Sequence, residues 1–484
     1  MTRPRTHEEL IVVTRPVAIA HEKGGRALAA AAPRGEAGLR AIVREGGCEL
    51  KPLFRPHHAP HHAPLIAKRG PPTAEAASSL DGFYCAYGPE QELRRVAERL
   101  RAALPLVAAY VRPGAELATR EEAPRGPPQV PPEADTSDFH LRQRYLDPLP
   151  GVDARGAWGR LGALGDGVRI VDLEWAWRYA HEDLAGLRGG VIGGQPVQDH
   201  AHEDHGTAVL GVLGACHNGF GVRGLVPNAQ VDAVALQDSN TDPTELALPL
   251  AEAICFAADR LAPGDLILLE VQMPGRRCGF ARRGDAYGYI APEWWPDVFA
   301  AIRYAAAREV LVVEAAGNGA QDLDDPLYDE RAEGFPASWS NPFRGGVSSG
   351  AIVVAAGAPD DHETRLGFSN YGSRVDAHAW GDEVFTTGYG LFMAAGRNRT
   401  YTHRFDGTSS AAAIVAGVLA SVQGVLRQHG RAPLKPADAA RLLRSTGKAP
   451  QRDIRIGNRP QLRELIDVAL EQQAPLPRDA RPGR

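Results

Sequence analysis

Hydrophobic runs of strand length alternate with helical patterns through most of the second half of the chain. Apolar runs that predict strands are separated by segments with the 3.6-residue periodicity of helices. The predicted strands cover residues 168–172, 231–236, 266–271, 310–315 and 351–356; the predicted helices begin at His205 or cover 244–260, 297–308, 409–429, 436–445 and 460–471. This alternation predicts an α/β fold with a doubly wound, mostly parallel sheet and helices on both faces.

The first part of the chain has a different pattern. It predicts strands at 10–20, 48–54, 82–87 and 106–111 and helices at 36–45 and 89–104. Two βαβ halves of this kind make a small ferredoxin-like α+β domain. We therefore expect an N-terminal domain over 1–112, a Pro-rich linker over 113–139, a main domain over 140–472 and a flexible tail over 473–484.

Composition narrows the classes of function. The 484 residues are 44% hydrophobic and 23% charged, and the net charge of −5 provides no basic field for nucleic acid. We see neither a signal-peptide pattern at the N-terminus nor an apolar stretch long enough to span a membrane, which favours a cytoplasmic protein without a membrane partner. The cysteines are odd in number and scattered, which predicts reduced thiols: Cys48, Cys85, Cys216, Cys255 and Cys278.

A turn of small residues near the C-terminal end presents a serine at the start of a helix. The segment 405–417 reads FDGTSSAAAIVAG, with Ser409 in the first helical turn. Backbone N–H groups there have no partner within the helix and favour a developing oxyanion. The segment predicts a nucleophile, although a plain buried helix with a glycine cap would read similarly.

Three other segments supply groups that a serine nucleophile needs. Asp172 ends the strand 168–172, and His205 opens an apolar helix. A serine hydroxyl is a weak nucleophile until a histidine takes its proton and a carboxylate fixes the histidine's tautomer. Asn318 follows a hydrophobic strand in a small-residue loop, where its amide can donate to an oxyanion.

With these four segments in this order, the chain resembles the subtilases, the subtilisin-like serine peptidases, over about residues 140–447. The resemblance implies that Asp172 orients the imidazole, His205 acts as general base and then acid, Ser409 is the nucleophile and Asn318 the oxyanion donor. It implies a serine endopeptidase that hydrolyses protein or peptide substrates through an acyl-enzyme, with no required cofactor. The N-terminal domain would be a propeptide-like chaperone and inhibitor, or else a recognition domain.

Two segments depart from the subtilase pattern. Residues 173–177, LEWAW, stand where a small hydroxyl residue and glycine are usual, so the loop after Asp172 must be shaped differently. The strand that lines the substrate normally ends in Ser-Leu-Gly and here reads Glu270-Val271-Gln272. We expect these three residues to contact substrate, with a different pocket.

An acidic loop at 321–330 follows the oxyanion asparagine and raises a hypothesis about specificity. Asp324 and Asp325, together with Glu270, would select Arg or Lys before the cleaved bond, because an unpaired carboxylate rewards a cation. A solvated charged loop is the plainer alternative. A structural calcium ion held by these carboxylates is a third.

Metal binding is a weaker alternative at two histidine-rich segments. The run 199–205, DHAHEDH, contains carboxylates and histidines that suit zinc, but the apolar helix after His205 favours catalysis. We expect His200, His202, His181 and His217 to be surface or supporting residues. The tract HHAPHHAP at 57–64 favours an extended, solvated linker over a metal site because of its prolines.

Two other functions remain open from the sequence. A peptide ligase uses the same acyl-enzyme and differs in the nucleophile that attacks it. A non-catalytic peptide-binding protein on a peptidase scaffold is disfavoured by the complete set of Asp172, His205, Ser409 and Asn318.

Overall fold

The computed structural model describes residues 8–14, 36–54, 80, 82–88, 90–118, 135–236, 248–344, 346–394, 396–450 and 454–476. The predicted histidine-rich tract at 57–64 lies outside these residues, and so does most of the predicted C-terminal tail.

A seven-stranded sheet forms the centre of the larger part of the molecule, and every neighbouring pair in it is parallel. Its order is β14-β13-β12-β9-β6-β8-β7. The strands are β6 (Arg169–Glu174), β7 (Val191–Gly193), β8 (Gln230–Ala235), β9 (Leu266–Leu269), β12 (Leu311–Ala315), β13 (Ala351–Gly357) and β14 (Ala377–Trp380). The predicted doubly wound, parallel sheet is confirmed.

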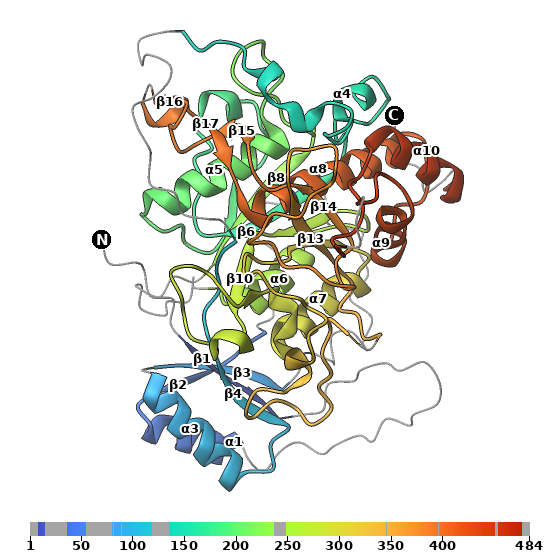
Figure 1. Ribbon diagram of the computed structural model, residues 1–484. Helices are drawn as coiled ribbons and strands as arrows, with labels where there is room; N and C mark the ends of the chain where they lie inside the picture. Colours follow the sequence, from blue (N-terminus) through green and yellow to red (C-terminus); the bar gives the residue numbers. More distant parts are fainter. Residues whose placement is uncertain are drawn as a thin grey trace.

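Helices cover both faces of this sheet, because its strands are apolar on both sides. Along β9, Leu266 and Leu268 pack on one face, whereas Ile267 and Leu269 pack on the other. The first face is covered by α5 (His200–Gly214) and α8 (Gly407–Gln428), and the second by α6 (Leu250–Ala258) and α7 (Pro296–Ala307) (Figure 1). α9 (Pro436–Ser445) and α10 (Leu462–Gln472) follow α8, and the short α4 is Ala154–Ala157.

α8 is the central helix of the first face. Its residues from Gly407 to Leu426 are buried, and by length and composition it could cross a membrane. The apolar window is wholly enclosed by the rest of the structure, as in a core helix. Nearby lies a three-stranded antiparallel sheet of order β15-β17-β16, formed by β15 (Val384–Thr387), β16 (Met393–Ala394) and β17 (Thr400–Phe405).

The N-terminal part forms its own antiparallel sheet of order β2-β3-β1-β4. The elements are β1 (Glu9–Val13), α1 (Glu36–Glu45), β2 (Glu49–Pro52), β3 (Phe83–Tyr87), α3 (Glu90–Ala103) and β4 (Ala108–Arg112). This βαββαβ arrangement is the one that the hydrophobic pattern predicts. Alternate residues of β1 face opposite ways: Leu10 and Val12 pack against α1 and α3, whereas Ile11 and Val13 pack against the larger part.

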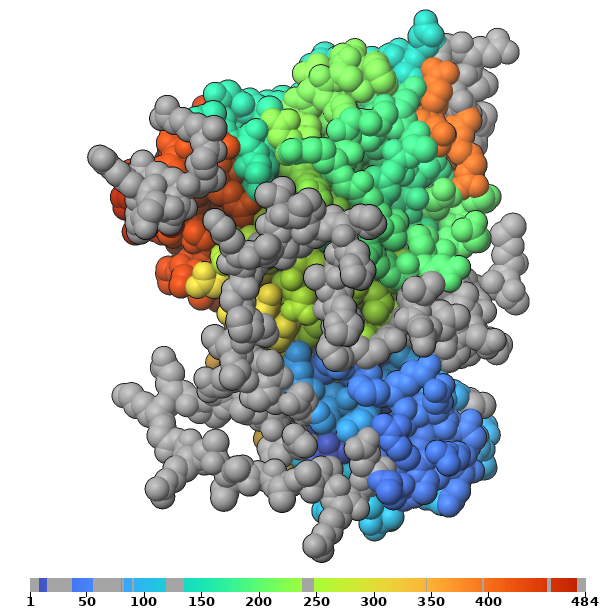
Figure 2. Space-filling view, turned by 180° about the vertical axis from the view of Figure 1, so that it is seen from behind, coloured from blue at the N-terminus to red at the C-terminus, as the bar shows by residue number. Residues whose placement is uncertain are grey.

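The outer face of the N-terminal sheet therefore carries its helices, and the inner face lies on α6 and α7 (Figure 1). Seen from behind, the N-terminal part is a blue lobe below the larger part (Figure 2). A buried charge cluster fixes this contact. Arg112 on β4 lies between Glu9 and Asp297, with 3.0 Å from its Nε to the Asp297 carboxylate, and Tyr110 donates a hydrogen bond of 2.9 Å to the same carboxylate. Asp297 stands in the first turn of α7, so a helix of the larger part anchors the smaller sheet.

The chain that connects the two parts is a strand at one point, which corrects the prediction of a linker over the whole of 113–139. β5 (Glu116–Leu117) pairs antiparallel with β10 (Val271–Pro274), and β11 (Tyr289–Ile290) pairs with the other edge of β10. The single strand predicted at 266–271 is divided into β9 and β10.

Stability of the larger part depends on a buried ion cluster beneath its sheet. Arg374 binds Glu293 through two hydrogen bonds of 2.6 and 2.9 Å and binds Asp376 at 2.8 Å. Arg374→Ala should lower the free energy of unfolding by about 3–5 kcal/mol, because it leaves the buried Glu293 carboxylate without its cation, whereas Asp376 keeps Arg444 at 2.7 Å. Urea denaturation of the unchanged chain and of the variant measures this.

Arg344→Ala is the matched control. Arg344 pairs with Asp329 at 2.9 Å, and both side chains are more than a third exposed. An exposed pair contributes less than about 1 kcal/mol. Equal losses in the two variants would contradict the assigned role of burial.

Candidate active site

Ser409 lies in the first turn of α8 and is fully buried. The strand β17 delivers the chain to Asp406, which precedes the helix. Small residues follow Ser409, so the helix packs closely on the sheet and places this turn at the carboxyl ends of the central strands. The predicted serine at a helix start is therefore present.

Asn318 lies beside that turn, with its side-chain amide oriented by two hydrogen bonds and its backbone N–H held by a third. Its Oδ1 accepts from the backbone N–H and the hydroxyl of Thr408, both at 2.9 Å, and its own N–H donates to Gln272 at 2.7 Å. Its Nδ2 has no hydrogen-bond partner among the described residues. Because Oδ1 is held, Nδ2 is the group left to donate to an oxyanion.

The loop that carries Asn318 is held by a second asparagine. Asn370 donates from its Nδ2 to the carbonyls of Ala316 and Tyr289, and its Oδ1 accepts from the N–H of Gln321. Gly317 has φ +97°, and a Cβ there would come within 2.8 Å of the Asn370 amide. The loop thus needs glycine at this position.

His205 lies in the second turn of α5, and its partner is Glu174 rather than Asp172. His205 Nδ1 lies 2.8 Å from Glu174 Oε2, and both side chains are fully buried. Asp172 instead accepts a 2.7 Å hydrogen bond from the indole N–H of Trp177. The prediction that Asp172 orients the imidazole is therefore wrong in this structure.

The difference has a simple origin in the strand. β6 continues two residues beyond Asp172 and ends at Glu174. Residues two apart in a strand face the same way, so both carboxylates point toward α5 and the one nearer the strand end reaches the histidine. Reading the apolar run through Leu173 would have placed the end of the strand at Glu174.

The bulky loop after β6 fits because α5 has a glycine beside its histidine. Trp177 packs against Gly206, where a Cβ would lie 2.2 Å from the Ala176 carbonyl oxygen and 2.5 Å from the Trp177 ring. The predicted difference in the shape of this loop is thus present, and the tryptophan takes the hydrogen bond of Asp172.

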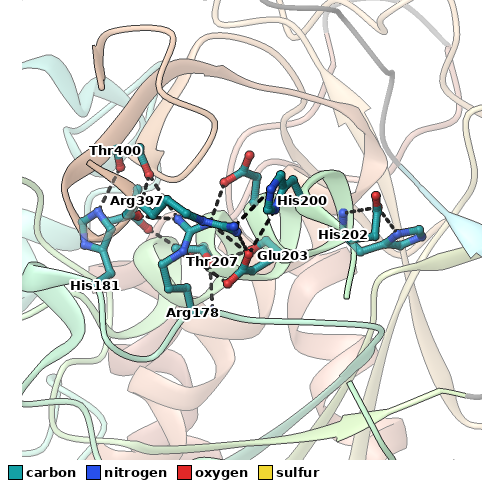
Figure 3. Close-up of polar contacts among 11 residues, drawn as sticks. Arg178, His181, His200, His202, Glu203, Thr207, Arg397 and Thr400 are labelled. Carbon is teal, nitrogen blue, oxygen red and sulfur yellow. Dashed lines mark hydrogen bonds and ion pairs between the residues drawn. The ribbon is translucent and has the colours of Figure 1, made fainter. Parts of the chain in front are cut away.

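The first turn of α5 is fixed by a charge network (Figure 3). Glu203 pairs with both Arg178, from the loop after β6, and Arg397, from the loop before β17. His200 lies 3.1 Å from Arg397, and His202 lies 2.6 Å from Asp199, the residue that caps the helix. This network ties three segments together next to His205.

The three histidines of the run 199–205 therefore contact protein groups, and so do two histidines elsewhere in the chain. His181 contacts the Thr400 carbonyl at 2.9 Å, and His217 contacts the Gly224 carbonyl at 3.0 Å. Within the described part of the chain, no group of three or more His, Cys, Asp or Glu side chains could hold a metal ion. All five cysteines are free thiols.

The chain's own segment 115–118 occupies the site. Leu117 pairs with Val271 and Glu116 with Gln272, which are two of the residues predicted to contact substrate. The Ala118 N–H donates to the Glu270 carbonyl at 3.0 Å. The carbonyl of Ala118 accepts a hydrogen bond of 3.2 Å from the Ser409 N–H. Ala118 is thus held as a substrate residue would be, with its carbonyl at the nucleophile.

Three buried carboxyl groups surround the histidine and serine. Burial, followed by repulsion from Asp172 and Glu174, raises the pKa of Glu270, and the neighbouring Ser409 hydroxyl opposes this. Burial and then Glu174 raise the pKa of Asp172, and burial raises the pKa of Glu174 to about 8. Burial lowers the pKa of His205 to about 4. The closed site therefore retains protons on its acids at neutral pH.

The acidic residues proposed to select a basic substrate have other partners. Asp324 binds Ser373 and Arg455, and Asp325 binds Arg277 and caps a short 3-10 helix. Their charges are already compensated, so they do not form the unpaired acidic pocket that the hypothesis required. Glu270 is fully buried next to Ser409, where it is part of the reaction centre.

Comparisons with known proteins show which family the sequence resembles. Residues 278–459 match the model of the subtilase family, Peptidase_S8. Alkaline elastase YaB of Bacillus sp. (strain YaB) is 30% identical over 54% of this chain and 56% of its own length. Thermitase of Thermoactinomyces vulgaris is 29% identical over 61% of this chain and 86% of its own. The chain thus spans little more than half of some curated relatives.

A solved structure supports the fold. The crystal structure of fervidolysin from Fervidobacterium pennivorans, a keratinolytic enzyme related to subtilisin, matches with a TM-score of 0.57 and 18% identity. The match covers 99% of this chain and 62% of that one.

The assignment of Glu174 leads to a test by two isosteric changes. Glu174→Gln should lower the rate of peptide-bond cleavage about 10⁴-fold, because a neutral amide no longer fixes the imidazole tautomer or stabilises the imidazolium. Asp172→Asn should cost no more than about tenfold, since its carboxyl group bonds to Trp177 and to Glu174 rather than to His205. Single-turnover rates measure both, and circular dichroism checks folding. The reverse order of the two losses would restore Asp172 as the orienting group.

Proposed function

Since this chain belongs to the subtilase family of serine peptidases, we propose that it is an endopeptidase that cleaves peptide bonds with Ser409 as nucleophile, His205 as general base and Glu174 as the orienting carboxylate. The observation that carries the proposal is the Ala118 carbonyl bound by the Ser409 N–H, 3.2 Å away. Hydrolysis through an acyl-enzyme accounts for this arrangement.

Each group has a defined part in the reaction. His205 Nε2 takes the proton of the Ser409 hydroxyl while Oγ bonds to the carbonyl carbon of the substrate. Negative charge then develops on the carbonyl oxygen, where the Ser409 N–H and the Asn318 amide donate hydrogen bonds. Glu174 stabilises the imidazolium through Nδ1–H.

The tetrahedral intermediate formed by this attack then collapses. His205 returns its proton to the amine on the far side of the bond, the C–N bond breaks and the acyl group stays on Ser409. Water attacks the ester with His205 again as base, which gives a carboxylic acid and free serine.

We further propose that the N-terminal part is an intramolecular inhibitor and that the first bond cleaved is the one after Ala118. Three contacts support this: β5 lies on β10, Gln272 Nε2 donates to the Leu117 carbonyl at 2.9 Å, and the Ala118 carbonyl meets Ser409. The inner face of the N-terminal sheet on α6 and α7 holds this segment in the site.

Incubation of the purified full-length chain should yield fragments 1–118 and 119–484, measured by intact mass. Ser409→Ala should remove this cleavage, because the nucleophile is absent. Ser410→Ala is the matched control: its hydroxyl bonds to the Trp380 and Gly407 carbonyls, so cleavage should continue. Cleavage that persists in Ser409→Ala would overturn the proposal.

The rate of this cleavage should depend on Glu174. With a pKa of about 8 in the closed chain, Glu174 is protonated at neutral pH and donates to Nδ1, which leaves the imidazole proton on Nε2, where it cannot accept from Ser409. Raising the pH through about 8 ionises Glu174 and should accelerate cleavage. The pKa of His205, lowered to about 4 by burial, keeps the imidazole neutral throughout.

Intact-mass time courses over about pH 6–9 test this dependence. Glu174→Gln should lose the rise with pH along with most of the rate. A wild-type rate that is constant across this range would contradict the assigned ionisation.

A further inference from the structure

Glu116 has a defined position within the strand that occupies the site. It pairs with Gln272 across β5 and β10, and it is the third residue before the proposed cleaved bond, with Leu117 and Ala118 after it. The register is fixed by two hydrogen bonds just after it: the Leu117 carbonyl accepts from the Gln272 side chain, and the Ala118 N–H donates to the Glu270 carbonyl. Any peptide bound in the same register would present its third residue at this place.

Two side chains of the larger part contact the Glu116 carboxylate. Arg282 Nε lies 3.2 Å from Glu116 Oε1, and the two side chains are only 30% and 27% exposed. Tyr289, on β11, is buried and hydrogen bonds to the same carboxylate. Burial, and then the charge of Glu116, raise the pKa of the Tyr289 hydroxyl, so it remains a donor.

The position of these donors is set by their own surroundings. The Tyr289 oxygen also accepts a 3.1 Å hydrogen bond from the Arg283 backbone N–H. The hydroxyl proton therefore points away from that N–H and is available to Glu116. The adjacent guanidinium, that of Arg283, is engaged by Asp285 through two hydrogen bonds of 2.8 and 2.7 Å. The two neighbouring arginines therefore have different partners. Arg282 contacts the strand in the cleft, and Arg283 contacts its own loop.

We propose that Arg282 and Tyr289 form a subsite for an acidic side chain, so that the peptidase selects peptides with Glu at the third residue before the cleaved bond. The inference rests on the proposed function, because it assigns a substrate class to the same cleft. A cation with a neutral hydroxyl donor matches a carboxylate and repels a lysine. This preference for an acidic side chain is the opposite of the preference for Arg or Lys that the acidic loop first suggested.

Fluorogenic peptides provide the test. Ala-Glu-Leu-Ala, the sequence of 115–118, is compared with Ala-Gln-Leu-Ala and Ala-Lys-Leu-Ala, each carrying a reporter after the last alanine, using the full-length chain after it has been incubated to process itself. We expect kcat/KM to be about tenfold higher with Glu than with Gln, and lower still with Lys. Arg282→Ala should bring the Glu to Gln ratio close to one, and Arg282→Glu should favour Lys.

Arg283→Ala is the matched control and should keep the preference for Glu, since its partner is Asp285. Turnover of all three peptides at equal rates by the wild-type chain would overturn the subsite and leave the proposed peptidase activity standing. A preference that survives Arg282→Ala would also overturn it.

A second readout does not need catalysis. In full-length Ser409→Ala, hydrogen–deuterium exchange over residues 113–118 should accelerate with Glu116→Gln and with Arg282→Ala, and the double variant should exchange no faster than either, because one contact is lost in all three. If no peptide is turned over at all, the proposed function is wrong. The hydrogen–deuterium exchange measurement still shows whether Arg282 holds Glu116. Exchange that both changes leave unaltered would overturn the subsite.

Discussion

The antiparallel pairing of β5 with β10 determines the state of the whole reaction centre. Only three residues separate the end of β4, at Arg112, from β5, so the smaller sheet and the strand in the cleft are positioned together. The pairing delivers the Ala118 carbonyl to Ser409 and removes His205 and its carboxylates from water. Burial is the first cause of every pKa shift at the centre, so the protonation of the site follows from this contact between short strands.

Polar side chains around the reaction centre hold its residues in one arrangement through hydrogen bonds and ion pairs. Asn318 is fixed by Thr408 and Gln272, its loop is fixed by Asn370, and the turn that precedes His205 is fixed by Glu203 between two arginines. Each buried group is held by partners from other segments, which keeps the donors in place before any substrate enters. A small number of reacting groups is therefore sufficient, because they do not have to be rearranged when substrate binds.

Sequence patterns predicted the parts of the site that local chemistry specifies. Ser409 stands in the first turn of α8, His205 in the second turn of α5 and Asn318 in the loop after β12, each within small residues that mark the position. Asn318 lies against the turn that carries Ser409. The alternation of strands and helices likewise predicted the sheet and its two helical layers.

The remaining parts depend on tertiary contacts that no local pattern records. Choosing between Asp172 and Glu174 requires knowing where β6 ends against α5, a matter of two residues. The strand at Glu116 lies in a Pro-rich stretch without strand periodicity and exists because β10 offers an open edge. Asp324 and Asp325 looked unpaired because Arg455 and Arg277 are distant in sequence.

The closeness of Ala118 to the buried acids affects the fate of the product strand after the first cleavage. Hydrolysis there would turn a neutral amide carbonyl into a terminal carboxylate, whose ordinary pKa lies near 3.5. That new anion would stand beside Glu270, with Asp172 and Glu174 in the same pocket. Those acids keep their protons at neutral pH, so the new anion has no cation beside them and stands in a buried pocket where an unpaired charge is costly. The product strand would therefore be held less firmly after cleavage than before it. The hold of the N-terminal part would then also depend on dilution, because the two pieces are no longer one molecule.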